Sequence, residues 1–291
     1  MIRALVRLMR PHQWVKNGFV FLGVVFGHGW DAPALLTGAL ALFAAFCLCS
    51  SAVYIVNDIA DRDADRQHPT KRLRPLARGD VGVAPALSLS VALALAGLAL
   101  AFTVSVSALM IAAAYIALNL AYSAGLKHVA ILDVFMIAGG FMLRILAGTA
   151  GIGIPPSKWL LLCGLMLTLF LAFGKRRAEL LAAAGNGNGA GQRASLDGYS
   201  RTLLDVLITV SVSCSAIGFA LYTVDAETVA LHGTDKLILT LPFVLYGLFR
   251  YLQLIYVKSG GGDPAWEVLH DPHLIVTTAG WLGSVAWILA S

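Results

Sequence analysis

Charged residues are scarce in this sequence. Only 13% of its 291 residues are Asp, Glu, Lys or Arg, and 58% are hydrophobic, whereas a soluble domain carries about 25% charged residues. The mean hydropathy is +0.79. Apolar runs approach the roughly 20 residues that a membrane-crossing helix needs, and they are continuous rather than alternating. We therefore expect an all-α integral membrane protein.

Cysteine pairs are missing as well. The four cysteines lie inside apolar runs and none forms a C-x-x-C pair, so the sequence indicates neither a zinc site nor a disulfide framework. The net charge of +5 could suggest a nucleic-acid partner. However, the basic residues concentrate between the apolar runs, where they would meet anionic headgroups and anionic substrates. We expect a bilayer and no nucleic acid as partner.

Nine membrane spans are predicted from the apolar runs. Gly27, His28 and Gly29 interrupt the first run near its end, and the sixth should continue out of the bilayer into a charged loop. The predicted spans are 17–31, 33–57, 83–104, 106–122, 129–152, 157–183, 202–224, 236–257 and 269–290. We interpret residues 1–291 as a single membrane domain, with an amphipathic surface helix over 1–13.

The basic residues also predict the orientation. With the N-terminus inside, 18 of the 21 Lys and Arg residues fall on the inner side, as expected for cytoplasmic loops. Three inner loops carry most of the chemistry, and we interpret them as cytoplasmic active-site loops: 58–82, 123–128 and 175–201.

The second span ends in a row of acidic residues, N-D-x-x-D-x-x-x-D, formed by Asn57, Asp58, Asp61 and Asp65. Steps of three and four place these side chains on one face of a helix. Like charges so close together repel, and near a membrane they are costly. Oxygen ligands that leave room for water and phosphate suit Mg²⁺. We expect these four residues to bind Mg²⁺; the alternative is a solvated charge cluster that ends the helix.

A basic cluster follows the acidic row. Lys71, Arg72, Arg74 and Arg78 form K-R-x-R-P-L-x-R-G. Carboxylates that hold a metal, followed by Lys and Arg, are typical of a diphosphate site. Lys16 and Asn17 near the first span could contact a phosphate, or Lys16 could be an interfacial anchor.

Two further loops carry candidates. Tyr122 and Lys127 lie at the same cytoplasmic mouth as the acidic row, although a Lys beside a span is commonly an anchor. Lys175, Arg176 and Glu179 lie where the sixth span leaves the membrane, before a Gly/Asn segment, GNGNGAGQ. That segment could be a lid or a slack connector.

The fifth span contains two charged residues, Asp133 and Arg144. Eleven residues are close to three helical turns, so both should project from one side of the helix. Charges inside a membrane are functional candidates because burying them is expensive. The alternative is a structural ion pair with a neighbouring helix.

The acidic row with H-P-T-K-R-L-R-P-L-A-R-G resembles the first aspartate-rich motif of the UbiA-type intramembrane prenyltransferases. RPHQWVKN, YSAGLKHVAILDVF with Arg144, and FGKRRAEL resemble one branch, the decaprenyl-phosphate phosphoribosyltransferases. The superfamily resemblance implies nine transmembrane helices around a cytoplasm-facing cavity in a bacterial plasma membrane, with Mg²⁺ holding a diphosphate. The branch resemblance implies a role in lipid-linked arabinose precursors of cell-envelope glycans.

One departure from the general family pattern favours this branch. Aromatic prenyltransferases carry a second acidic motif between helices six and seven, where this chain has Lys175, Arg176 and Arg177. One acidic and one basic cluster suit two different phosphorylated substrates. We expect transfer of 5-phosphoribose from phosphoribosyl pyrophosphate to a polyprenyl phosphate.

The resemblance and the residues together assign roles. Asp58, Asp61 and Asp65 would be catalytic through the metal. Lys71, Arg72, Arg74 and Arg78 would hold the phosphates of phosphoribosyl pyrophosphate. Lys127, Lys175 and Arg176 would bind the lipid phosphate. The remaining substrate-binding candidates are Lys16, Asn17, Asn57, Tyr122, Arg144 and Glu179.

Two other functions stay open at this stage. An aromatic (quinone-precursor) prenyltransferase would use a prenyl diphosphate and make a carbon–carbon bond. A secondary transporter would also have many spans and intramembrane charges, but here the charges gather at one mouth rather than at the midplane. A homo-oligomer is left open.

Overall fold

A computed structural model describes residues 2–27, 29–67, 71–185, 194–258, 260–262 and 264–290. Every regular element in these residues is a helix, as expected. The chain divides into two compact units: unit 1 is Met1–Pro156 with Asn188–Gly198, and unit 2 is Ser157–Gly187 with Tyr199–Ser291. Each is described by itself, and the single membrane domain stays a prediction. Residues 186–193, which include all of the Gly/Asn segment after Gly185, lie outside the described residues.

Eight helical segments of the described chain are long and apolar enough to cross a membrane. They match the second to ninth predicted spans to within a few residues. They are α3 (Pro33–Ala60), α6 (Val83–Val104), α7 (Val106–Ala124), α8 (Leu132–Ala147) with η5 (Ala150–Ile152), α9 (Lys158–Gly185), α10 (Arg201–Val224), η7 (Lys236–Thr240) with α12 (Leu241–Tyr256), and α14 (Pro272–Ala290).

Shorter helices connect these segments. Labels with η denote 3₁₀ helices. The short elements are α1 (Ile2–Met9), η1 (Pro11–Phe21), α2 (Leu22–Phe26), η2 (Gly29–Asp31), α4 (Arg62–Gln67), η3 (Lys71–Leu73), α5 (Pro75–Arg78), η4 (Leu126–His128), η6 (Ala194–Gly198), α11 (Ala226–His232) and α13 (Pro264–His270). Within residues 1–13, helix α1 ends at Met9 and a 3₁₀ helix begins at Pro11, so the predicted single helix is divided; its place on a membrane surface stays a prediction.

The first predicted span, 17–31, does not form one long α-helix. It is divided among η1, α2 and η2. Glycine contacts explain the difference. A Cβ on Gly23 would lie 1.7 Å from the carbonyl oxygen of Gly148, and a Cβ on Gly148 would lie 1.7 Å from the carbonyl oxygen of Val20. The segment therefore packs backbone against backbone beside the end of α8, a tertiary contact that hydropathy does not encode.

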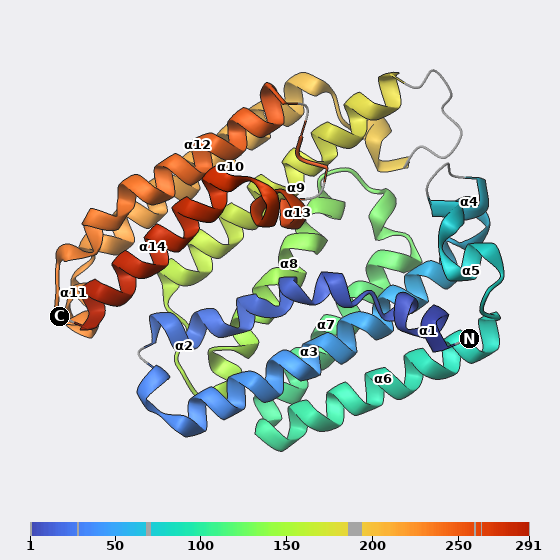
Figure 1. Ribbon diagram of the computed structural model, residues 1–291, viewed down its shortest axis with the longest axis horizontal. Coiled ribbons are helices and arrows are strands. Elements are labelled where there is room, and N and C mark those ends of the chain that lie inside the picture. Colours follow the sequence, from blue (N-terminus) through green and yellow to red (C-terminus); the bar gives the residue numbers. More distant parts are fainter. Residues whose placement is uncertain are drawn as a thin grey trace. The chain divides into compact units, whose positions relative to one another are not determined.

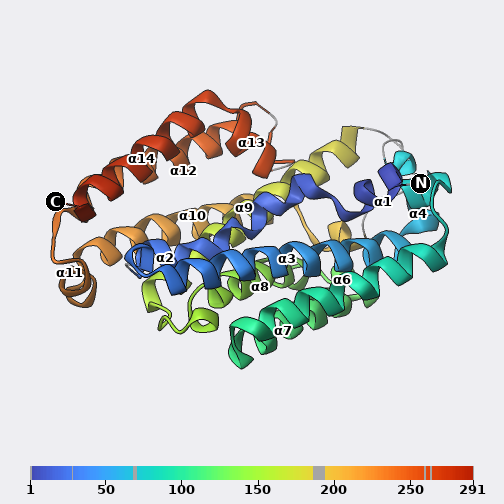
Figure 2. The same ribbon diagram turned by 60° about the horizontal axis from the view of Figure 1, so that its bottom comes forward.

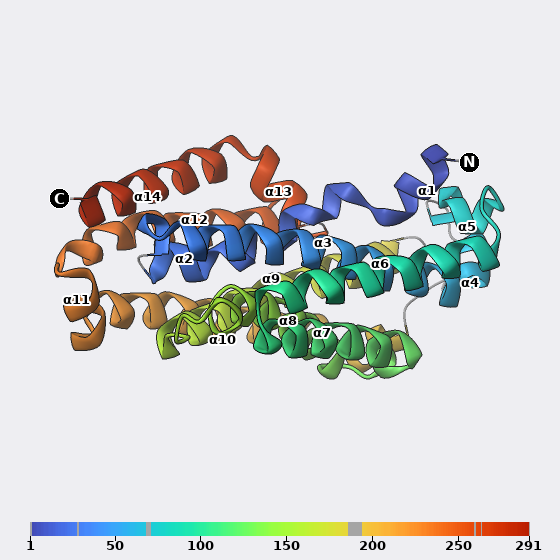
Figure 3. The ribbon, with the colours of Figure 1, turned by 90° about the horizontal axis from the view of Figure 1, so that it is seen from below.

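Helix α3 is the centre of unit 1. It packs along α6, as Figures 1 and 3 show, and also contacts α7 and η1. Its span is 61% buried, compared with 22% for α6 and 17% for α7. Gly97 allows the close approach of α6, since a Cβ there would lie 2.6 Å from the Sγ of Cys49. Cys47 and Cys49 are both buried in this part of α3.

Unit 2 consists of two packed helix pairs. Helix α9 packs along α10, and α14 packs along α12, which Figure 2 shows as a hairpin closed by α13. Arg177 links α9 to α10 and α12: its Nε lies 2.6 Å from Oδ1 of Asp205, and its Nη1 donates to the carbonyl of Ile255 at 3.2 Å. Its guanidinium also lies 4.3 Å from the centre of the Tyr256 ring.

The glycine contact predicts a difference between two neighbouring substitutions. Gly23→Ala should lower the melting temperature in detergent, because overpacking a tight site costs about 1–3 kcal/mol. Gly18→Ala is the matched control, since a Cβ there meets no atom within 4 Å. Thermal unfolding followed by circular dichroism measures both. Equal melting temperatures of the two variants would contradict the close approach.

Candidate active site

The acidic row lies where α3 ends and α4 begins. Asn57 and Asp58 are in the last turn of α3, Asp61 is the residue between the helices, and Asp65 is in α4. Helical hydrogen bonds continue across this junction: the N–H of Asp61 donates to Asn57 at 2.9 Å, and that of Asp65 donates to Asp61 at 2.8 Å. The helical spacing expected from the sequence is therefore kept although the helix is interrupted.

Asp58 and Asp65 converge on one cation, the guanidinium of Arg74. Nη1 of Arg74 lies 3.0 Å from Oδ1 of Asp58 and 2.7 Å from Oδ2 of Asp65. The two acids are only 2% and 3% exposed. Arg74 has an extended backbone before Pro75, as is usual for a residue that precedes proline. The basic cluster thus does supply a partner to the acidic row.

Arg10 is a second partner of Asp58 and was not among the sequence candidates. Its Nη2 is hydrogen-bonded to Oδ1 of Asp58, and its guanidinium lies 5.3 Å from the centre of the Tyr54 ring. Arg10 has φ 52° and ψ 58°, a left-handed conformation that is uncommon for a residue other than glycine. The sequence signal for Arg10 is its place at the head of RPHQWVKN, the segment that also contains Lys16 and Asn17.

Asp61 is paired with Lys127, the candidate from η4. Nζ of Lys127 contacts Oδ1 of Asp61, and Lys127 is only 8% exposed. Nδ2 of Asn57 donates to Oδ2 of Asp61 at 3.2 Å, and the Ser123 hydroxyl donates to Oδ1 of Asn57 at 3.2 Å. Tyr122 lies beside Ser123 in the last turn of α7. The structure thus brings the acidic row and the 123–128 loop together.

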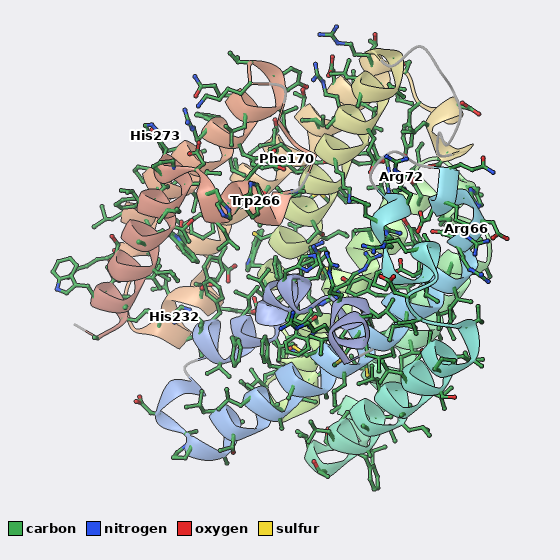
Figure 4. All side chains as sticks on the ribbon, turned by 45° about the vertical axis from the view of Figure 1, so that its right-hand side comes forward. Arg66, Arg72, Phe170, His232, Trp266 and His273 are labelled. Atoms are coloured by element: carbon green, nitrogen blue, oxygen red, sulfur yellow. The ribbon has the colours of Figure 1, made fainter. Side chains whose placement is uncertain are left out.

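The other members of the basic cluster lie further along the chain than the acidic row. Lys71 and Arg72 are exposed on η3, and Figure 4 labels Arg72 beside Arg66 of α4 at the same end of unit 1. Nε of Arg78 lies 3.5 Å from Asp80, and Arg66 pairs with the exposed Asp63 at 3.1 Å.

Asn17 and Arg144 form a separate, buried network. Nε of Arg144 donates to Oδ1 of Asn17 at 2.7 Å, and Nη2 donates to the hydroxyl of Tyr115 at 2.9 Å. Nη1 donates to the carbonyl of Gly140 at 2.8 Å. Asn17 also donates to Ser50 at 3.3 Å. Lys16, next to Asn17, is half-buried in η1.

Asp133 and Arg144 are both buried in α8, but each has its hydrogen bonds elsewhere. Asp133 accepts from Ser195 at 3.1 Å, whereas Arg144 is bonded to the neutral groups of its own network. Among the contacts of the described residues, Arg144 has no carboxylate within salt-bridge distance. The structural ion pair considered for Arg144 is therefore not the arrangement found; its role in binding substrate stays a prediction.

The basic triplet of the third loop is divided between two surroundings within unit 2. Arg177 is the link between helices described above. Nη1 of Arg176 pairs with Oε2 of Glu179 at 2.5 Å, one turn along α9. Lys175, Arg176 and Glu179 thus belong to a different unit from the acidic row. Their place opposite the acids stays a prediction.

No group of three or more His, Cys, Asp or Glu side chains in the described ranges is close enough to hold a metal ion. The two histidines near α14 have protein partners. The His270 ring stacks on the Trp266 ring, with 3.4 Å between the ring centroids, and Nδ1 of His273 is hydrogen-bonded to the Tyr246 hydroxyl at 2.8 Å. Figure 4 labels Trp266 and His273. Asp271, just before α14, accepts two hydrogen bonds from Arg250 at 3.1 and 2.7 Å. The Arg250 hydrogen bonds lower the pKa of Asp271 to about 2.

Comparisons with known proteins agree with this architecture. Residues 18–267 match the UbiA prenyltransferase family. The chain belongs to this family. The decaprenyl-phosphate phosphoribosyltransferase of Corynebacterium glutamicum is 36% identical over 96% of this chain and 84% of that relative. The enzyme of the same name from Mycolicibacterium smegmatis is 33% identical, covering 98% and 92%.

A solved structure shows the same fold. A UbiA homolog from Archaeoglobus fulgidus, bound to GPP and Mg²⁺, aligns with a TM-score of 0.74 over 99% of this chain and 100% of that one. The two sequences are 19% identical, so the likeness extends to the fold alone. The roles of the unit 1 residues in this UbiA-family chain therefore rest on their own contacts.

The Arg144 network predicts a stability effect. Tyr115→Phe removes the acceptor of one buried guanidinium N–H, and an unsatisfied buried donor costs about 1–3 kcal/mol. We expect a lower melting temperature in detergent. Tyr246→Phe is the control because its hydroxyl bond to His273 is exposed. If Tyr115→Phe melts like the control, the buried hydrogen bond does not stabilise unit 1.

Proposed function

We propose that the protein transfers 5-phosphoribose from phosphoribosyl pyrophosphate to a polyprenyl (decaprenyl) phosphate and releases pyrophosphate. The observation that carries the proposal is the convergence of two buried carboxylates, Asp58 and Asp65, on one cation. The chain is also similar over nearly its full length to relatives named for this reaction. The product would serve lipid-linked arabinose precursors for cell-envelope glycans, as the sequence resemblance implies.

The carboxylates fit a magnesium ion. Oxygens of Asp58 and Asp65 lie within 3.0 Å of the same nitrogen of Arg74, so a single cation can be shared between them. That nitrogen is a stand-in for a metal, although Mg²⁺ would need shorter contacts of about 2.1 Å. Asp61 and Asn57 are bonded to Lys127 and Ser123, and they would turn towards the ion to supply further oxygen ligands. We propose that these four residues hold Mg²⁺.

The charges of the row are balanced by basic residues of unit 1. Asp58, Asp61 and Asp65 are matched by Arg10, Arg74 and Lys127. We propose that these three cations exchange partners when substrate binds: they leave the carboxylates and hold phosphate oxygens. Arg10 and Arg74 would hold the pyrophosphate with Lys71, Arg72 and Arg78, and Lys127 would turn to the lipid phosphate.

The reaction is a substitution at the anomeric carbon of ribose. The bond from this carbon to the pyrophosphate oxygen breaks, and a bond to an oxygen of the polyprenyl phosphate forms. Bound at the carboxylates, Mg²⁺ would neutralise the pyrophosphate as it leaves. The attacking oxygen is already anionic near pH 7, so the protein needs no general base. The residues of the protein would bind and orient the two substrates and neutralise their phosphate charges.

The lipid phosphate is proposed to bind Lys127, Lys175 and Arg176 by direct ion pairs. Lys16, Asn17, Tyr122, Arg144 and Glu179 are proposed to line the substrate site. We also propose nine crossings around a cytoplasm-facing cavity in a bacterial plasma membrane. The support is the bias of Lys and Arg towards the loops on the side of the acidic row.

A direct assay tests the reaction. Purified protein is incubated with labelled phosphoribosyl pyrophosphate, polyprenyl phosphate and Mg²⁺. Chloroform-extractable label should form only when both substrates are present. Label transfer from a prenyl diphosphate to an aromatic acceptor, or transport without chemistry, would overturn the proposal in favour of the corresponding alternative function.

The role of the acids predicts that Asp58→Asn abolishes metal-dependent turnover while the protein still folds in detergent. The amide is nearly isosteric but loses the charge that would hold Mg²⁺. Asp63→Asn is the matched control, because the Asp63 side chain is 87% exposed and forms an ion pair with the exposed Arg66. Turnover and gel-filtration profile are measured together; full activity of Asp58→Asn would contradict the metal role.

The exchange of partners predicts opposite effects from one substitution. Arg10→Gln leaves Asp58 with one guanidinium instead of two, so Mn²⁺ should bind more tightly in the absence of substrate. The KM for phosphoribosyl pyrophosphate should rise roughly tenfold, as expected for losing one charge-assisted hydrogen bond.

Electron paramagnetic resonance of free Mn²⁺ measures the first effect and steady-state kinetics the second. Arg66→Gln serves as the control; it removes the exposed pair with Asp63 and a hydrogen bond to the carbonyl of Ala77, and it leaves Asp58 with both guanidinium groups. Weaker Mn²⁺ binding in Arg10→Gln would show that Arg10 does not compete with the metal.

A further inference from the structure

Within unit 1, the short helix η6 is held against the start of α8 by a buried polar contact. The hydroxyl of Ser195 donates to Oδ2 of Asp133 at 3.1 Å. Ser195 is 1% exposed and Asp133 is fully buried. Sixty-two residues of chain separate the two, so this contact is tertiary and fixes η6 to the start of α8.

A tight apolar contact lies beside it. A Cβ on Gly198 would be 2.5 Å from the Cβ of Ala130, which is closer than two carbons can approach. Leu196, which lies between Ser195 and Gly198 in the sequence, is also buried. Helix η6 further contacts η4, the 3₁₀ turn that carries Lys127. The docked surface thus runs from Asp133 back along the chain towards Lys127.

The backbone under η6 is strained. Ile131 has φ 68° and ψ −51°, and the N–H of Leu132 donates to the carbonyl of Ala130 at 2.8 Å. This is the γ-turn with positive φ, which is rare and unfavourable. A β-branched residue holds such a conformation only when surrounding contacts impose it. The contacts on either side of Ile131 are those of η6 with Ala130 and Asp133.

We propose that Ser195, Gly198, Ala130 and Asp133 form a clamp, here called the η6 clamp, that positions Lys127 on the acidic row. The strained turn begins three residues after Lys127, so its shape sets where η4 and the Lys127 ammonium lie relative to Asp61. The residues of the clamp are positioning residues and do not touch substrate. The inference rests on the proposed function only in giving Lys127 a lipid phosphate to bind.

If Asp133 had only a local role in α8, it would not affect the position of Lys127. An acid in the first turn of α8 is favourable by itself because of the helix dipole, and Ser195 could merely satisfy it. In that case, loss of the Ser195 hydroxyl would lower stability slightly and leave Lys127 unaffected. The clamp instead requires that changes in η6 alter both the accessibility of Lys127 and its binding of the lipid phosphate.

The experiment uses the full-length protein in detergent with four variants. Ser195→Ala removes the hydrogen bond, Ser195→Thr restores a hydroxyl, and Gly198→Ala pushes η6 away from Ala130. Ser107→Ala, an exposed position on α7, is the control. An amine-reactive reagent labels Lys127, and mass spectrometry follows the rate, with Lys158 as the internal reference. Steady-state kinetics gives the KM for each substrate.

We expect Ser195→Ala and Gly198→Ala to speed labelling of Lys127 roughly tenfold, the effect of losing about 1.4 kcal/mol of local stability. Lys158 should be unchanged, and Ser195→Thr should be closer to wild type than Ser195→Ala. The KM for polyprenyl phosphate should rise while the KM for phosphoribosyl pyrophosphate and kcat stay within about twofold.

Unchanged labelling of Lys127 in both disrupting variants would overturn the clamp. So would faster labelling with both KM values unchanged, because the clamp would then not position Lys127 for substrate. If the wild-type protein transfers no phosphoribose, the proposed function fails, and the labelling rates still decide whether η6 holds Lys127.

Discussion

Buried carboxylates that must be neutralised are the constraint on which unit 1 depends. Asp58 and Asp65 are almost completely buried, and an unpaired charge in such a place costs several kcal/mol. Arg10, Arg74 and Lys127 come from three segments that are far apart in the sequence. Each segment is thereby tied to the end of α3. Such pairs add little net stability, but they fix which segments meet there.

The position of the acids makes external cations necessary. Asp58 lies in the last turn of α3 and Asp61 directly follows it. The C-terminal end of a helix carries a partial negative charge, so carboxylates there are disfavoured. Neither the helix nor the bilayer compensates for them. Carboxylates placed in this way need cations from elsewhere, and in the proposed function a metal ion that arrives with an anionic substrate would replace the guanidinium groups.

Much of this arrangement follows from local sequence. Eight of the spans correspond to apolar runs, and the acidic row keeps its steps of three and four because helical bonding continues past Asp61. The division of 17–31 was not predictable, since it depends on Gly23 meeting Gly148. Nor does sequence say that Arg74 turns inward while Arg72 stays exposed. That choice is made by tertiary contacts around Pro75, which is buried.

Arg10 could not be found from pattern because its placement requires a backbone conformation that Arg seldom adopts. Arg10 and Ile131 are the two non-glycine residues with positive φ in the described part of the chain. Arg10 is itself a cation of the site, and Ile131 lies four residues after Lys127. Residues in such conformations cost on the order of 1–3 kcal/mol. Their presence beside Asp58 and Lys127 indicates that unit 1 gives up stability in order to hold these two cations against the acids. In the proposed function these are the cations that would bind a diphosphate and a lipid phosphate, so the strain would preorganise the phosphate site.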